Sequence, residues 1–169
     1  MSALHAADVE AIVRNGPGGH KAELRLWLRL LSCTNLGTTA IRRRLRAEFG
    51  VTLPQFDLMA QLDREPAGLR LGELSARMMV TNGNITGLVA RLVAERLVKR
   101  KAVPGDGRAA VVALTPAGAR LFARMARAHE NWIAELFAKV GRRRAKALTD
   151  ELRTVKNSVR SAIVAGRAP

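Results

Sequence analysis

Apolar residues recur at helical intervals along most of the chain, and breaks in this pattern divide it into segments. Steps of three and four predict a long helix over residues 20–49 and three shorter helices over about 53–65, 70–79 and 81–97. Two further long helices are expected over about 116–140 and 142–163. Between them the period changes, because the β-branched run "AVVALT" follows the turn sequence "PGDG". Residues 98–114 are therefore predicted to form a β-hairpin with its tip at residues 105–108.

This order of elements predicts a mainly α protein with a small β-hairpin. A short helix, a tight turn, a second helix and a basic hairpin together make a winged helix-turn-helix, which we expect over residues 51–115. The first 19 residues end in the breaker cluster "NGPGG" and are expected to form a flexible arm or a short helix. Within the long first helix, the run "SCTNLGTT" is polar and has a poor helix propensity.

The charge of the chain indicates a polyanionic partner. Lys and Arg total 29 against 14 Asp and Glu, which gives a formal net charge of +15. Nucleic acid is the first candidate and an anionic membrane surface the second. The alternative is a charge that only keeps the protein soluble.

Several classes of site lack their signatures in this sequence. There is one cysteine, Cys33, and the three histidines lie far apart, so we expect no metal site and no cofactor. Paired carboxylates, a nucleophile beside a base and a phosphate-binding glycine loop are also missing, so an enzyme is not expected. No apolar run approaches the ~20 residues of a membrane span, and the N-terminus does not resemble a signal peptide. These features predict a cytoplasmic protein without a membrane partner.

The segment "TNGNITGLVARLVAERLVKR", residues 81–100, begins with small polar residues where a helix has to start. Each of its two glycines costs roughly 1 kcal/mol of helix stability relative to alanine. On a helical wheel one side is an apolar stripe of Ile85, Leu88, Val89, Leu92 and Val93. The other side carries Gly83, Gly87 and Ala90, flanked by Asn84, Thr86 and Arg91.

Such a face suits the major groove of DNA, which is ~12 Å wide, because small side chains let the backbone come close. Short amides and hydroxyls then reach the base edges. We predict DNA contacts in this segment from Thr81, Asn82, Asn84, Thr86 and Arg91. Two alternatives stay open: Asn and Thr serve only as helix caps, and the glycines mark close helix packing.

The predicted hairpin supplies a second group of basic residues. Arg100 and Lys101 lie at its base, and Arg108 at its tip can enter the minor groove. Asp106 can hold the Arg108 guanidinium in one direction by a charge-assisted hydrogen bond. The alternative is a solvated turn with a chance Asp–Arg pair.

The chain resembles the MarR family of bacterial transcriptional regulators from about residue 20 onward. The resemblance is carried by "VTLPQFDLMAQL", "LGELSARMMVTNGNITGLVARLVAERLVKR" and "GDGRAAVVALTPAG". It implies a homodimer that binds a palindromic operator in double-stranded DNA, with repression as the expected effect. It also implies that residues 20–50 form a dimerisation helix and residues 116–169 the C-terminal dimerisation helices. "LPQFDLMAQL" and "MMVTNGNITGLV" further resemble family members that govern the catabolism of aromatic acids and hydroxycinnamates.

The resemblance also implies release from DNA by a small-molecule effector, here an aromatic acid or its CoA thioester. We predict that the pocket flanks the helix-poor "SCTNLGTT", with lining from Trp27, Leu30, Thr34, Phe56, Met59 and Met125. Close helix packing through Gly37 is the alternative for that stretch. The family's hydroperoxide sensors use tyrosines around a cysteine near the start of the first helix. This chain has no tyrosine and Cys33 falls mid-helix, so Cys33 is expected to be a buried inert thiol and not an oxidation sensor. The alternative function is a non-specific nucleoid-type DNA- or RNA-binding protein.

Overall fold

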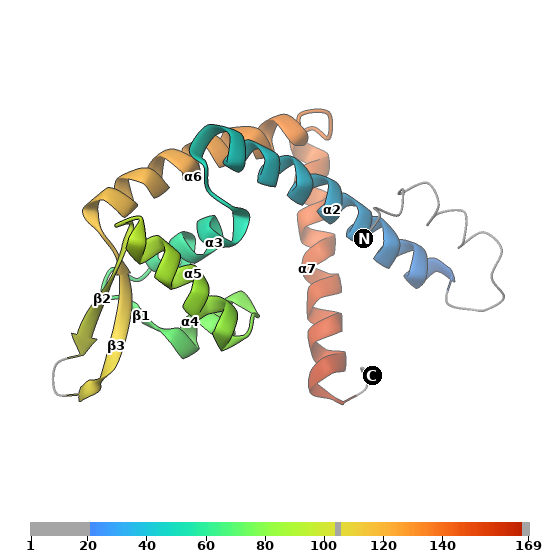
Figure 1. Ribbon diagram of the computed structural model, residues 1–169. Coiled ribbons are helices and arrows are strands. Elements are labelled where there is room, and N and C mark those ends of the chain that lie inside the picture. The colour runs from blue at the N-terminus through green and yellow to red at the C-terminus, as the bar shows by residue number, and fades with distance from the viewer. Residues whose placement is uncertain (1–20, 104–105, 167–169) are drawn as a thin grey trace. The chain divides into compact units, whose positions relative to one another are not determined.

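The computed structural model describes residues 21–103 and 106–166, and only the backbone of residues 102, 103 and 106–109. In chain order the elements are α2 (Lys21–Phe49), α3 (Leu53–Asp63), β1 (Leu69–Arg70), α4 (Leu71–Met78), α5 (Asn82–Ala94), β2 (Val98–Val103), β3 (Asp106–Leu114), α6 (Pro116–Leu136) and α7 (Arg142–Val164) (Figure 1). The chain divides into two compact units, Met1–Ala128 and His129–Pro169. The predicted arm over residues 1–19 lies outside the described residues. The fold class is confirmed, since a small sheet accompanies a mainly helical chain.

The first long helix is unbroken through the polar run that interrupts its pattern. α2 spans 29 residues, and within it only Ile41 and Leu45 are buried, both in its C-terminal half. A Cβ added at Gly37 would meet no atom within 4 Å, so this glycine does not serve close packing within the described chain. The N-terminal half instead exposes Leu24, Trp27 and Leu31.

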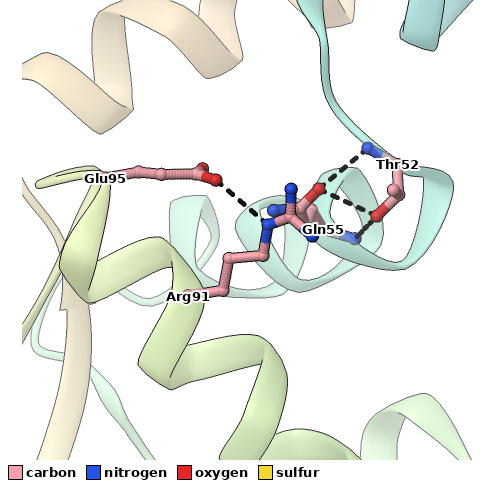
Figure 2. Close-up of polar contacts among 4 residues, drawn as sticks. All are labelled: Thr52, Gln55, Arg91 and Glu95. Atoms are coloured by element: carbon pink, nitrogen blue, oxygen red, sulfur yellow. Dashed lines mark hydrogen bonds and ion pairs between the residues drawn. The ribbon is translucent and has the colours of Figure 1, made fainter.

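Helix α3 begins with two reciprocal hydrogen bonds (Figure 2). The Gln55 amide N–H donates to the Thr52 hydroxyl oxygen at 3.4 Å, and the Thr52 N–H donates to Gln55 Oε1 at 2.9 Å. This capping box satisfies two of the four backbone donors that a helix start leaves without partners. It also explains why Gln55 is the one polar residue in the described core, with 2% of its surface exposed.

The sheet contains a strand that the sequence did not predict. Its order is β1-β3-β2, and all neighbours are antiparallel. β1 has only two residues, with Leu69 opposite Val112. Gly68 precedes it at φ +100°, and a Cβ there would lie 2.8 Å from the Val112 carbonyl oxygen. Glycine is therefore required for the chain to enter the sheet at this point.

The core of the first unit joins α3, α4, α5, the sheet and the start of α6. The rings of Phe56 and Phe122 pack at a tilt, with centroids 5.5 Å apart, and Met125 is fully buried. Burial of each such side chain contributes about 1.5–3 kcal/mol. The first half of α6 therefore packs into this core through Phe122 and Met125. The helix also ends at Leu136, before the predicted residue 140.

In the second unit, α7 buries none of its residues. Its exposed apolar side chains follow helical spacing at Leu148, Leu152, Val159 and Ile163. This stripe has the pattern that the sequence predicts for a helix with its partner outside the chain.

Hydrogen bonds of Thr115 link the start of α6 to the residues that follow α5. Its hydroxyl accepts the Gly118 N–H at 3.0 Å and lies 2.8 Å from the Arg96 carbonyl oxygen, to which it donates. The Thr115 N–H donates to the Leu97 carbonyl oxygen at 3.0 Å. At Gly118 the two backbones are so close that a Cβ would lie 1.9 Å from the Leu97 oxygen.

Gly118→Ala is expected to destabilise the fold by about 1–3 kcal/mol, because the added methyl group forces α6 away from Leu97. Gly37→Ala is the matched control, since it adds the same methyl group in open space. The control should gain roughly 1 kcal/mol from helix propensity. Urea unfolding of both variants measures this, and a Gly118→Ala protein as stable as wild type would contradict the close approach.

Candidate nucleic-acid interface

Helices α4 and α5 are joined by a three-residue turn and form the helix-turn-helix pair (Figure 1). Leu74 of α4 is fully buried, as are Ile85, Val89 and Leu92 of α5. The predicted stripe of α5 is thus confirmed at these three positions, whereas Val93 is 37% exposed at its margin. Burial of this stripe fixes which face of α5 is left for a partner.

The outward face of α5 is open, as the small residues in the sequence suggest. Asn82, Asn84, Thr86 and Ala90 are exposed. A Cβ added at Gly83 or Gly87 would meet nothing within 4 Å. The alternative that these glycines mark close helix packing therefore does not hold within the described chain. The two glycines lower helix stability without a packing gain, which is typical of a site where function overrides propensity.

Two of the predicted contact residues, Thr81 and Thr86, make hydrogen bonds within α5 or at its start. The Thr81 hydroxyl accepts the Asn84 N–H at 3.5 Å and is the N-cap of the helix. The Thr86 hydroxyl donates to the Asn82 carbonyl oxygen at 2.9 Å. Thr81 thus caps the helix, and its contact with DNA stays a prediction. The side-chain amides of Asn82 and Asn84 make no hydrogen bond within the described part of the chain, so both are available to base edges.

Arg91 is directed along its own helix toward Glu95 (Figure 2). Its Nε lies 3.1 Å from Glu95 Oε1, and the two side chains are 59% and 39% exposed. An exposed pair at i and i+4 contributes only about 0.3–0.5 kcal/mol. A DNA phosphate can therefore replace Glu95 as the partner of Arg91 at small cost.

The hairpin places its basic residues differently from the prediction. β3 begins at Asp106, so Arg108 lies within this strand and not in the turn. The side chains of Asp106 and Arg108 are outside the described residues, and their pairing stays a prediction. Arg100 and Lys101 are consecutive residues of β2 and therefore point to opposite faces of the hairpin. Arg100 is exposed and Lys101 half-buried.

The six predicted pocket residues fall into two groups. Phe56, Met59 and Met125 are buried in the core of the first unit. Trp27 and Thr34 are exposed on α2, and Leu30 is half-buried there. Cys33 is exposed as well, so the expectation of a buried thiol is wrong within this chain.

A hollow of about 610 Å³ lies elsewhere, between the C-terminal half of α2 and the start of α3. It is lined by Thr39, Arg42, Arg43, Arg46, Thr52, Leu53 and Pro54. None of the six predicted pocket residues is among them. This arginine-lined hollow has a mostly apolar wall with three arginines and no carboxylate, which suits a ligand with an apolar body and an anionic group. The sequence offered no sign of it, because it forms only when α3 packs beside α2.

Known proteins match both the sequence and this architecture. The sequence profile of the MarR family matches residues 49–109, which cover most of the winged helix-turn-helix, from the end of α2 into β3. A MarR family transcriptional regulator from Silicibacter pomeroyi is 34% identical, with a TM-score of 0.72 over 85% of this chain and 99% of that one. The chain belongs to the MarR family.

Two curated relatives agree with this assignment. An uncharacterized HTH-type transcriptional regulator of Mycobacterium bovis is 32% identical over 117 residues, 68% of this chain and 81% of the relative. The transcriptional activatory protein BadR of Rhodopseudomonas palustris is 31% identical over 96 residues, 56% of this chain and 54% of BadR. This MarR family chain is accordingly a DNA-binding transcriptional regulator.

Two negative findings concern the described residues alone. Within them, no three His, Cys, Asp or Glu side chains come together as a metal site would require. None of the helices described here is long and apolar enough to cross a membrane.

Substitutions at Gly87 are expected to move stability and DNA binding in opposite directions. Gly87→Ala should stabilise the fold by up to about 1 kcal/mol through helix propensity. In the series Gly87→Ala, Gly87→Leu, DNA affinity should fall as the side chain grows, because the helix backbone is held away from the groove floor. Thermal unfolding and fluorescence anisotropy measure the two effects. Full affinity in Gly87→Leu would show that this face does not meet DNA.

Proposed function

We propose that this regulator binds a palindromic operator as a homodimer, represses transcription and leaves the DNA when a small anionic effector binds. The observation that carries the proposal is the outward face of α5. Its glycines have open space around them, and its asparagine amides have no partner in the described chain. A helix with such a face fits the major groove, where base edges distinguish all four base pairs.

The charge of the chain supports contact with the DNA backbone around this helix. Lys and Arg number 29 against 14 Asp and Glu, so many basic side chains lie outside the described ion pairs. Arginine and lysine contacts to phosphates position a protein on the duplex without reading sequence, while the α5 amides would read base edges. Arg91 and Arg100 are the exposed residues that we assign to phosphates.

Two apolar stripes support a homodimer. Leu24, Trp27 and Leu31 recur along one side of α2, and all three are more than 40% exposed in the single chain. α7 exposes Leu148, Leu152, Val159 and Ile163 in the same manner. Contiguous apolar surface of this kind marks a protein interface. In a two-fold dimer the recognition helices meet half-sites one DNA turn apart, about 34–36 Å.

The arginine-lined hollow supports the choice of an anionic effector. A carboxylate or a CoA phosphate can bind Arg42, Arg43 and Arg46 by charge-assisted hydrogen bonds. The sequence resemblance to regulators of aromatic acid catabolism supports an aromatic acid or its CoA thioester as the ligand class. To release DNA, the effector has to bind the DNA-free conformation more tightly than the bound one.

The sign of regulation belongs to the proposal as well. Repression is the usual mode that the family resemblance implies. BadR, one of the relatives, is by its name a transcriptional activator.

A non-specific DNA- or RNA-binding protein is the competing function, and the net charge is the observation that favours it. Binding of that kind depends on phosphate contacts and falls steeply with salt. It does not need the exposed amides and open glycines of α5. The ratio of operator to random-sequence affinity separates the two functions.

Fluorescence anisotropy with two duplexes at about 150 mM salt tests the function. One duplex comes from the intergenic DNA beside the protein's own gene, and the other has the same bases in scrambled order. We expect at least ~10³-fold tighter binding to the first, lost on addition of an aromatic acid or its CoA thioester. Equal binding to both, with a steep salt dependence, would favour the non-specific function.

Leu152→Asp is expected to weaken the dimer at least a hundredfold, because a homodimer carries two copies of the change and each places a charge in an apolar contact. Asn157→Asp is the matched control, since it adds the same charge on α7 away from the stripe. Sedimentation equilibrium measures both. A Leu152→Asp protein that dimerises as wild type does would exclude this part of α7 from the interface.

A further inference from the structure

The turn that leads into α5 contains a methionine in a backbone conformation that methionine disfavours. Met79 has φ 54° and ψ 41°, which is the left-handed helical region. Side chains with a Cβ are strained there, and glycine or asparagine usually takes this place at the end of a helix. The strain therefore needs a compensating gain.

The rest of the turn fixes Met79 in this conformation. Its N–H donates to the Ala76 carbonyl oxygen at 3.3 Å, and the Val80 N–H donates to the Ser75 carbonyl oxygen at 3.2 Å. The Ser75 hydroxyl closes the turn from the other side, donating to the Val80 carbonyl oxygen at 2.5 Å. These bonds form the Schellman motif that ends α4 and sets the entry of α5.

Packing within the chain does not explain why position 79 carries methionine and not glycine. Its side chain is 92% exposed, more than any other large apolar side chain of the described residues. Glycine would keep all three hydrogen bonds and remove the strain. A long apolar side chain held in water at a strained position indicates a contact outside the chain.

DNA is the partner that the position of Met79 favours. The residue lies two positions before Thr81, the N-cap of α5, and the exposed Asn82 and Asn84 follow directly. Whatever the start of α5 binds therefore also meets the turn. A neutral thioether gains nothing from a phosphate. The C5-methyl group of thymine is the apolar group that base pairs present in the major groove.

We propose that Met79 packs against a thymine methyl group in each half-site and so contributes to operator specificity. The inference rests on the proposed function, because it needs α5 in the major groove. Met79 would then recognise the thymine methyl group, in addition to the α5 residues that hydrogen-bond to base edges. The polarisable, flexible methionine side chain is suited to such a contact.

Replacement of thymine by uracil tests the contact, since uracil lacks only the methyl group. The full chain is titrated by fluorescence anisotropy against its operator duplex, in which single thymines are replaced one at a time. In the wild type we expect one position in each half-site where uracil weakens binding about fourfold, the value for one buried methyl group. In Met79→Ala the thymine and uracil duplexes should bind equally at that position.

Three further variants separate the role of the Met79 side chain from that of the backbone turn. Met79→Leu keeps an apolar side chain and should retain most of the thymine preference. Arg96→Gly is the matched backbone control, because Arg96 is the other non-glycine residue with positive φ among those described. Both Met79→Gly and Arg96→Gly should raise the melting temperature by about 2–4 °C through relief of strain. Only Met79→Gly should abolish the thymine preference.

The proposal and the proposed function fail in different ways. An unchanged thymine-to-uracil ratio in Met79→Ala, with operator preference intact, would overturn the methyl contact alone. Equal weakening of both duplexes by Met79→Ala would also overturn it, since the side chain would then touch sugar and not the base. Absence of operator preference in the wild type would instead remove the function on which the inference rests.

Discussion

The close contact between Gly118 and the Leu97 carbonyl oxygen is the constraint on which the DNA-binding unit depends. At this point the residues between α5 and β2 meet the start of α6, and Thr115 links them through hydrogen bonds to Arg96, Leu97 and Gly118. The Leu97 N–H in turn donates to the Leu92 carbonyl oxygen at 2.9 Å, which continues the link into α5. A displacement at the start of α6 therefore reaches the recognition helix and the base of the hairpin without an intervening flexible segment.

This junction gives a physical route for the proposed ligand response. α6 continues as one helix past Ala128, the last residue of the first unit, toward Leu136. Within the first unit its Arg124 guanidinium lies 5.8 Å above the Phe49 ring at the end of α2. The arginine-lined hollow involves the same end of α2. A ligand that shifts this end of α2 can thus act on α6 through a direct contact, and on α5 through Thr115 and Gly118. Packed elements of this kind respond by discrete rearrangement, because a close-packed core does not deform continuously.

The sequence predicted correctly those elements whose own residues show a periodic pattern or a turn signal. The long helices, the stripe of α5 and the hairpin follow from periodicity and turn residues, and all are present. β1 was missed because two residues have no period, and they become a strand only by pairing with β3. Arg108 was assigned to the turn because "PGDG" is a turn sequence, whereas β3 already begins at Asp106 within it. The hollow and the burial of Phe122 depend on contacts between distant segments, which spacing along one helix does not reveal.

A non-glycine residue with positive φ lies just beyond each end of α5: Met79 before it and Arg96 after it. The reason for this backbone conformation differs between the two positions. At the C-terminal end, the Arg96 N–H donates to the Val93 carbonyl oxygen at 2.9 Å, and its own carbonyl accepts from Thr115. The left-handed conformation there is needed for the junction with α6, and the exposed arginine adds charge beside the wing. At the N-terminal end, the turn needs only the backbone of Met79. Its side chain is 92% exposed, and the proposed contact with a thymine methyl group would compensate for the strain there. Sequence reasoning about DNA contacts searches for polar and basic residues, and it therefore passes over an apolar residue at a helix break.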